Sequence, residues 1–400
     1  MTSILGAVLA VALLGIVLQD AFEVMLLPRR IHRRTRFTRF YFRATWSVWS
    51  RLARRIPKGM RREQFLGVFG PLSMVVLFAL WATTLVAGFG LLQWALQGGN
   101  PKGPSPLTEQ IYMSGVTFFT LGYGDVVPHS GAGRAVAVVE AGAGIGFIAI
   151  VIGYLPVLYQ FFSRREAHVI QLDARAGSPP TATTMLARHA EGEDLQSLNA
   201  LLQEWEVWCS ELLESHLSYP MLIYYRSQHD NQSWLAAITA VMDTCALILV
   251  GIDELKPLQA RMTFTMGRQV LVEMARSFGV SPSRYEGSDR LPHDAYLRMQ
   301  AIFAEAGLGW NGGANAEETL AALRATYEPL LDGLGSALLL PLPTWVAEED
   351  AADHWQGGHR GLIASRLIAQ LADRGSGGNE AEQPKDGRPS QRLRARLNRS

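Results

Sequence analysis

Three long apolar runs limit how this chain can fold. They cover residues 4–18, 65–96 and 135–162. A helix of about 20 apolar residues crosses the hydrocarbon core of a bilayer, so each run predicts one crossing. Apolar residues make up 48% of the 400 residues and charged residues 18%, with a mean hydropathy of +0.08. This balance indicates a chain that lies partly in lipid and partly in water.

The first apolar run can continue to residue 27, with Asp20 and Glu23 tolerated near its end. A cleaved signal peptide is the alternative interpretation, but such a peptide starts with basic residues and ends at a small-residue cleavage site. This run starts without a basic residue and ends in Leu-Leu-Pro-Arg-Arg at residues 26–30. We therefore predict an N-terminal transmembrane helix over residues 1–28.

A basic segment follows at residues 29–64. From Arg29 to Arg62 there are thirteen Lys and Arg residues and no acid. Aromatic side chains are interleaved with them: Phe37, Phe40, Tyr41, Phe42, Trp46 and Trp49. Such a stretch can bind nucleic acid, but its place between two apolar runs favours a cytoplasmic segment at the membrane surface. We expect membrane lipids as partners, anionic ones among them, and no nucleic acid.

The positive charges also predict the orientation. Lys and Arg collect on the inner side of a membrane, and Arg164 and Arg165 directly follow the third run. The N-terminus and the Gly- and Pro-rich residues 98–106 are then outside, and the chain after Arg164 is cytoplasmic. We expect a multi-pass protein of the cell inner (plasma) membrane.

The remainder of the chain reads as a soluble helical domain, residues 166–372, with a disordered tail at residues 373–400. Helical spacing or length marks residues 195–217, 234–252, 258–278, 294–306 and 317–334. Residues 235–250 are apolar enough for a further crossing, but they contain Asp243 and lack basic flanks, which favours a buried core helix. The two cysteines, Cys209 and Cys245, indicate no disulfide framework.

The most specific local pattern lies between the second and third runs. It consists of Thr120, Leu121, Gly122, Tyr123, Gly124 and Asp125. It follows a short helical stretch, residues 108–119, and precedes an apolar run. Backbone without helical pairing is tolerated at membrane depth only where it is buried in protein or lines a watery cavity. Gly122 and Gly124 permit positive φ at alternate positions, which aims consecutive carbonyl groups toward one axis.

This pattern resembles the selectivity filter of potassium channels, and the resemblance covers residues 65–165. It implies a pore domain there and an all-α membrane protein: three transmembrane helices, a pore helix and filter between the second and third, and a soluble α-helical cytoplasmic domain. It further implies a homotetramer that conducts K+. In this interpretation K+ is the permeating ion, and no cofactor is expected. The carbonyls of the filter would coordinate K+, namely those of Thr120, Leu121, Gly122 and Tyr123.

The resemblance also implies roles around the filter. Asp125 would lie at the outer mouth and tie the filter to the pore helix. The Tyr123 ring would face away from the pore and pack on pore-helix aromatics, namely Tyr112, Phe118 or Phe119. Two positions depart from the family pattern. Leu121 stands where Val or Ile is commoner, and Val116 stands where some bacterial members carry a Glu that bonds the filter aspartate.

The third apolar run contains four residues of interest. Gly144 lies twenty residues after Gly124 and matches the family's hinge glycine. With Gly142 it predicts either a gating bend or close helix packing, and both interpretations stay open. Pro156 is expected to kink or end the helix. Glu140 is a carboxyl group inside an apolar span, and we favour a structural tie to a neighbouring polar group over a direct ion site.

Two other function classes are alternatives. One is a membrane-tethered ligand sensor or enzyme with an attached pore, and the other is a weakly selective cation channel. His229 and Asp230 form the best metal-binding pair, but no further ligand follows at suitable spacing, so a solvated turn is favoured and we expect no enzyme. The intact Gly-Tyr-Gly pattern argues against weak selectivity. Ligand, pH, membrane tension, lipid and constitutive opening are all candidate gating stimuli.

Overall fold

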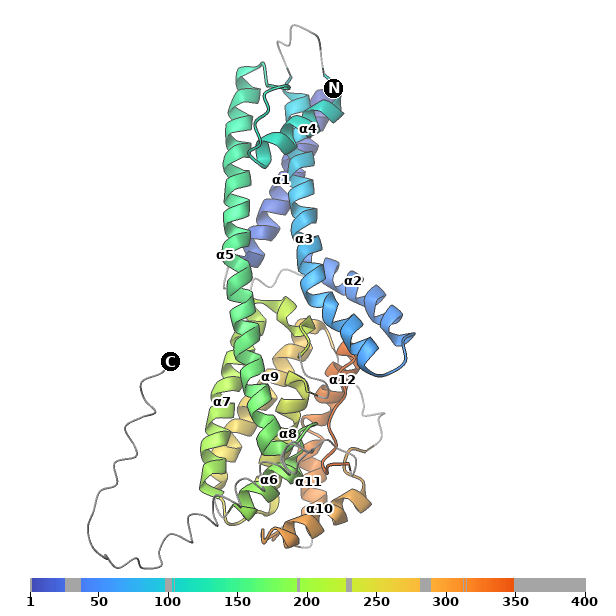
Figure 1. Ribbon diagram of the computed structural model, residues 1–400, viewed down its shortest axis with the longest axis vertical. Coiled ribbons are helices and arrows are strands. Elements are labelled where there is room, and N and C mark those ends of the chain that lie inside the picture. Colours follow the sequence, from blue (N-terminus) through green and yellow to red (C-terminus); the bar gives the residue numbers. More distant parts are fainter. Residues whose placement is uncertain are drawn as a thin grey trace, which may run out of the picture. The chain divides into compact units, whose positions relative to one another are not determined.

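The computed structural model describes residues 2–25, 37–97, 103, 105–192, 195–227, 232–280, 289–311, 313 and 315–348. These residues form twelve α-helices and one 3-10 helix, and no β-strand occurs among them (Figure 1). All of them belong to one compact unit, Met1–Ala352. The expected all-α class is confirmed for this part of the chain, whereas the expected tail, residues 373–400, lies outside the described residues.

Three long helices coincide with the three apolar runs: α1 (Thr2–Met25), α3 (Met60–Ala95) and α5 (Gly131–Ala176). Each is long and apolar enough to cross a membrane. Helices α1 and α3 run antiparallel, because Gly6 lies against the ring of Trp94 and Asp20 is bonded to Trp81. The start of α1 therefore lies beside the end of α3.

Asp20 is buried near the end of α1, and its partners explain how an acid is tolerated there. Trp81 Nε1 on α3 donates a hydrogen bond to Asp20 Oδ2 over 3.2 Å. The Thr38 hydroxyl at the start of α2 (Phe37–Arg54) donates to the same oxygen over 2.5 Å. A buried carboxylate with two donors avoids much of the desolvation penalty of an unpaired one. Asp20 thus joins α1, α2 and α3.

Helix α5 differs from the expected third run in its length. The run was expected to stop at Arg164 and Arg165, but α5 continues to Ala176 and has 46 residues. At 1.5 Å per residue it is about 69 Å long, roughly twice the thickness of a bilayer core. The expectation that Pro156 could end the helix is wrong, because twenty further helical residues follow it. Helix α5 therefore continues without a break from the three long apolar helices into the part of the chain that follows them, which is called the helical part below.

The helical part comprises α6 (Ala182–Glu191), α7 (Leu195–Ser218), the 3-10 helix η1 (Pro220–Tyr224), α8 (Trp234–Gly251), α9 (Pro257–Phe278), α10 (His293–Glu305), α11 (Ala316–Arg324) and α12 (Glu328–Leu338). The single helix expected over residues 317–334 is wrong, since α11 ends at Arg324 and α12 begins at Glu328. Pro329 lacks an amide hydrogen and its ring would clash with the carbonyl four residues earlier, so a continuous helix breaks there.

By length and composition α8 could also cross a membrane, which makes four such helices among the described residues. The surroundings of the four differ. Inside this one chain, 89% of the apolar window of α8 is already buried, against 11% for α5. Helices α6, α9 and α11 are among those that pack around α8. This burial favours the expected core helix.

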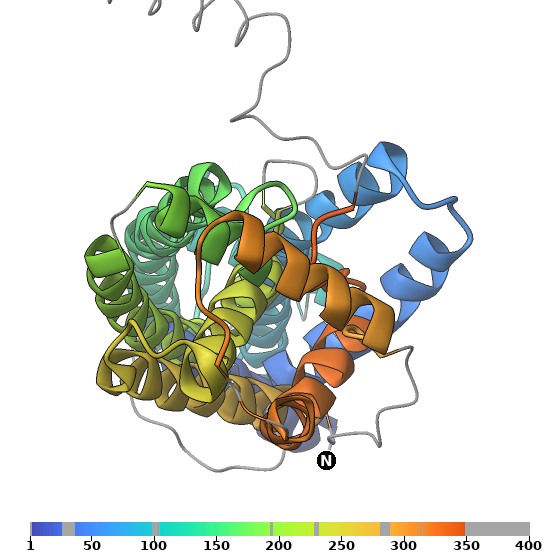
Figure 2. The same ribbon diagram turned by 90° about the horizontal axis from the view of Figure 1, so that it is seen from below.

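The basic segment forms helix α2 where it is described. Figure 2 views the chain from below and shows α2 (blue) at the edge of the helical part. The Trp46 indole donates to the carbonyl of Ala337 at the end of α12 over 2.9 Å. Exposed on α2 are both apolar and basic side chains, namely Phe40, Arg43, Val48, Arg51 and Leu52. This mixture is typical of a helix at a membrane surface.

Candidate functional site

The candidate site lies where the short helix α4 (Leu107–Phe118) turns back toward α5. After Phe118 the chain leaves the helix and becomes extended over residues 121–124. Two amide groups of the extended segment return to the helix end. Leu121 N donates to the carbonyl of Val116 over 2.8 Å, and Gly122 N reaches the same oxygen over 3.4 Å. Val116 therefore anchors the segment through its backbone carbonyl, although its side chain carries no carboxyl group.

The backbone of this segment alternates in the sign of φ. Gly122 has φ 63° and Gly124 has φ 76°, as the sequence predicts. Thr120 also has a positive φ of 60°, which the prediction missed. Glycine adopts such values at little cost, whereas another residue is strained by about 1–2 kcal/mol. The strain at Thr120 is offset by its surroundings, since its amide group donates to Thr117 O over 3.1 Å.

The alternation leaves the carbonyl groups free. Within the described part of the chain, no hydrogen bond is accepted by the carbonyl oxygens of residues 120–124. Unpaired carbonyl groups at membrane depth need a partner such as a bound cation or water. Residues 119–125 are all exposed in the single chain, with Tyr123 exposed by 68% and Leu121 by 56%. A row of unpaired carbonyl oxygens of this kind can coordinate a cation.

Asp125 follows the extended segment and is tied to α4. The Tyr112 hydroxyl donates to Asp125 Oδ2 over 3.0 Å, and Val126 N donates to Oδ1 over 3.1 Å. The sequence interpretation placed this carboxyl group correctly against α4 but did not name Tyr112 as its partner. The expected packing of the Tyr123 ring is not met within one chain, since no ring pair joins it to a described aromatic residue.

Glu140 lies fully buried on α5, and its partner is Ser114 on α4. The Ser114 hydroxyl is within hydrogen-bond distance of Glu140 Oε1 and lies 2.7 Å from the carbonyl of Val86 on α3. The expected tie to a polar neighbour is thus present, and Ser114 is the residue that sequence reasoning missed. Its only signal was a small polar residue on the inward face of a short apolar helix.

Gly144 packs one helical turn after Glu140. A Cβ atom on Gly144 would lie 1.9 Å from the carbonyl oxygen of Phe118, the last residue of α4. Gly142, in contrast, is exposed and a Cβ there would meet no atom within 4 Å. Pro156 is exposed within the continuous helix α5. Of the two interpretations left open for Gly144, this geometry directly supports close helix packing.

The lower part of α5 is anchored by Arg165, which sequence reasoning read only as a topology signal. Arg165 is 4% exposed. Its guanidinium donates to the carbonyl of Leu222 over 3.0 Å and to that of Tyr225 over 2.7 Å. Its Nη1 also lies 3.3 Å from Nε2 of His216 on α7. Burial is the main cause that lowers the pKa of His216 well below its ordinary value, and the positive charge of Arg165 is the second cause. The ring is therefore neutral.

The Leu222 and Tyr225 carbonyls belong to the segment around η1, which also contacts α2 and α3. The Tyr224 ring lies 5.1 Å from Trp46 on α2 and 5.2 Å from Phe69 on α3, measured between ring centroids. The same short segment therefore touches α2, α3 and α5. A displacement of this segment would therefore change its contacts with all three helices.

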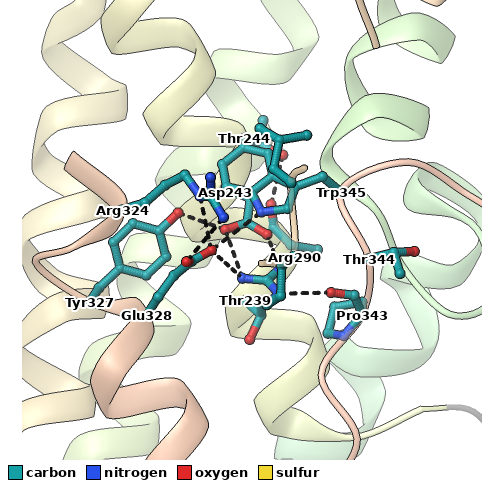
Figure 3. A network of polar contacts seen from close by, with 12 residues as sticks. Thr239, Asp243, Thr244, Arg290, Arg324, Tyr327, Glu328, Pro343, Thr344 and Trp345 are labelled. Atoms are coloured by element: carbon teal, nitrogen blue, oxygen red, sulfur yellow. Dashed lines mark hydrogen bonds and ion pairs between the residues drawn. The ribbon is translucent and has the colours of Figure 1, made fainter. Parts of the chain in front are cut away.

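The helical part contains a buried polar network, drawn in Figure 3. Arg290 pairs with Asp243 and, over 3.1 Å, with Glu328. The Tyr327 hydroxyl donates to Asp243 over 2.6 Å, and Arg324 also pairs with Glu328 over 3.1 Å. The charges thus neutralise one another, which fits a structural role better than a site open to substrate.

No group of three or more His, Cys, Asp or Glu residues that could hold a metal ion occurs among the described residues. His229 and Asp230 lie outside them.

Comparison with known proteins bears on the segment around α4. Residues 73–160 match a family model described as "Ion channel". The chain is 23% identical over 206 residues to "Uncharacterized membrane protein YdjJ" of Bacillus subtilis (strain 168), covering 49% of this chain and 60% of that protein. It is 35% identical over 84 residues to "Protein LctB" of Bacillus caldotenax and of Geobacillus stearothermophilus, covering 18% of this chain and 62% of theirs.

The chain thus spans about three fifths of the length of the curated relatives it matches. No solved structure matches it. The matched residues include α4, the extended segment and most of the apolar parts of α3 and α5. These findings support a membrane protein with an ion-channel domain at residues 73–160.

Proposed function

We propose that this chain is a subunit of a potassium-selective channel and that four copies surround one conducting axis. One observation carries the proposal. Residues 120, 122 and 124 have positive φ, and the carbonyl oxygens of residues 120–124 accept no hydrogen bond from the described chain. Rings of such oxygens replace the water shell of a K+ ion. The channel-family match over residues 73–160 supports the same reading.

In this proposal α4 is the pore helix and α5 the inner helix. A single chain leaves the filter exposed, together with apolar side chains along α5, for example Val138, Ile145 and Ile152. Exposed apolar side chains on a spanning helix need lipid or neighbouring subunits. The C-terminal, partly negative end of α4 is directed toward the filter. Four such dipoles together favour a cation at the middle of the membrane.

The proposed topology has three crossings, α1, α3 and α5. The start of α1 lies beside the end of α3, which supports an N-terminus on the same side as the loop after α3. The basic residues of α2 then face the cytoplasm, in line with the inside preference of Lys and Arg. Helix α8 is a core helix of the cytoplasmic domain, since its apolar surface is already covered by protein. Anionic lipid at the exposed basic face of α2 would be a fitting partner.

The cytoplasmic domain is proposed to influence gating through α5. Arg165 holds α5 to the η1 segment by two charge-assisted hydrogen bonds. Such bonds are about twice as strong as bonds between neutral groups. Because α5 is one continuous helix, a displacement of η1 is transmitted along it toward the filter.

The proposal is tested by replacing Gly122 with Ala in the full-length chain and measuring K+ and Na+ flux in liposomes. An alanine at φ 63° is strained by about 1–2 kcal/mol in each subunit, so the carbonyl geometry should be lost. We expect selective K+ flux to disappear. Gly67→Ala is the matched control, because Gly67 has ordinary helical φ and a Cβ there meets nothing within 4 Å.

Unchanged K+ selectivity in Gly122→Ala would count against the filter geometry. The assembly is tested separately by mass measurement of the complex in lipid. A monomer or dimer that still conducts K+ selectively is incompatible with the proposal.

A further inference from the structure

Glu140, Ser114 and Val86 form a three-group cluster where α5, α4 and α3 meet, with one group from each helix. Glu140 and Ser114 have no exposed surface. The Ser114 oxygen lies 2.7 Å from the Val86 carbonyl oxygen and within hydrogen-bond distance of Glu140 Oε1. The cluster thus contains two short contacts that meet at a single hydroxyl group.

Counting protons decides the direction of these contacts. A serine hydroxyl has one proton to donate, and a backbone carbonyl oxygen can only accept. The contact to Val86 therefore uses the Ser114 proton. The contact between Ser114 and Glu140 then needs a second proton, and only the carboxyl group of Glu140 can supply it. An ionised Glu140 would leave one of the two oxygen pairs without a proton between its members.

The charges around the cluster point the same way. Helix α3 has no charged residue after Glu63, and the one charged residue of α4, Glu109, is exposed. On α5, Glu140 is the one charged residue between Arg134 and Arg164. No cation on these helices faces the carboxyl group. An unpaired buried carboxylate is strongly unfavourable in a low-dielectric environment.

The second carboxyl oxygen gives an independent observation. Glu140 Oε2 is buried and has no hydrogen-bond partner in the described chain. It is already inaccessible within one chain, so a neighbouring subunit adds no donor unless the packing changes. A neutral carboxyl group tolerates one unpaired oxygen far better than a carboxylate does.

We propose that Glu140 carries its proton and donates it to Ser114, which donates to the Val86 carbonyl, so that this relay fixes the pore helix against both flanking helices. This inference rests on the proposed function. Glu140 is then a positioning residue that acts on the filter through α4. Ser114 and Phe118 lie one turn apart on α4, as Glu140 and Gly144 do on α5. The relay and the Gly144 packing contact are therefore two adjacent contacts between α4 and α5.

The experiment compares Glu140→Gln, Glu140→Leu and Ser114→Ala in the full-length chain. A glutamine amide is neutral and donates as the protonated acid does, so Glu140→Gln should keep K+ flux within about twofold of the unchanged chain. Glu140→Leu and Ser114→Ala remove the relay and should lower selective flux about tenfold or more. Glu140→Gln behaving like Ser114→Ala would overturn the proposal.

A readout that does not depend on conduction keeps the two proposals separable. Infrared spectra of the full-length chain in lipid at neutral pH should show the stretching band of a protonated carboxyl group. This band should be lost in Glu140→Gln and kept in Glu109→Gln, whose carboxyl group is exposed. Absence of the band in the unchanged chain would refute the relay even if K+ flux is intact. Presence of the band without K+ flux would refute the proposed function alone.

Discussion

Replacing Gly144 with Ala tests whether this residue serves packing or bending. The added Cβ would lie 1.9 Å from the Phe118 carbonyl oxygen and 2.8 Å from the Phe118 carbonyl carbon. Ordinary contacts begin at 3.4 Å, so α4 and α5 must separate by about 1.5 Å at this point. The obstacle is backbone at the end of a helix, which cannot rotate away as a side chain can.

The expected loss of stability follows from this overlap. Overpacking of a fixed site costs about 1–3 kcal/mol, and occasionally more. Alanine gains at most about 1 kcal/mol over glycine in a helix, so the net effect on the stability of the chain is destabilising. The displaced residue, Phe118, ends α4, and the extended segment begins three residues later. A shift of about 1.5 Å there exceeds the roughly 0.5 Å tolerance of a preorganised binding site.

We therefore expect Gly144→Ala to lower the thermal midpoint of the purified protein and to reduce K+ selectivity over Na+ in liposome flux. Gly142→Ala is the matched control on the same helix, because a Cβ there meets no atom within 4 Å. A purely bending role predicts altered opening with unchanged midpoint and selectivity. If Gly144→Ala and Gly142→Ala gave the same midpoint and selectivity, the packing argument would fail.

Three further predictions concern the ties around the pore and below it. Tyr112→Phe removes the 3.0 Å hydrogen bond to Asp125 and should destabilise the filter by about 0.5–1.5 kcal/mol. We expect K+ flux to be lost faster over time, and an unchanged time course would contradict the tie. Arg165→Met leaves the Glu166 carboxylate and two carbonyl groups without their donor and should destabilise the protein by about 3–5 kcal/mol. Arg164→Met is its control, since that side chain is 54% exposed, and equal thermal midpoints for the two variants would refute the anchor. Because the pKa of His216 is lowered in the folded chain, the unfolded chain binds a proton at a higher pH than the folded chain does. The contribution of His216 to stability is therefore complete above about pH 6.5 and falls by about 1.4 kcal/mol per pH unit below it. His216→Gln should flatten this pH dependence, and a slope equal to that of the unchanged chain would show that His216 does not cause it.

Local patterns made much of this protein predictable from its residues. The apolar runs predicted α1, α3 and α5 because a bilayer requires about 20 apolar residues in a helix. Gly122 and Gly124 predicted the alternating backbone because their freedom of φ belongs to the residue itself. The break at Pro329 was equally local and could have been read from the sequence, where residues 317–334 were instead predicted as one helix.

The contacts that hold the candidate site together were decided by the tertiary structure. Ser114 meets Glu140, Tyr112 meets Asp125, and Arg165 meets Leu222 and Tyr225. Hydropathy shows that a helix is apolar but not how it is rotated about its axis or which neighbour it meets. Two residues as far apart in the chain as Arg165 and Tyr225 become partners only when packing sets the rotation and height of each helix. For that reason the sequence indicated a tie for Glu140 but could not name Ser114 as its partner.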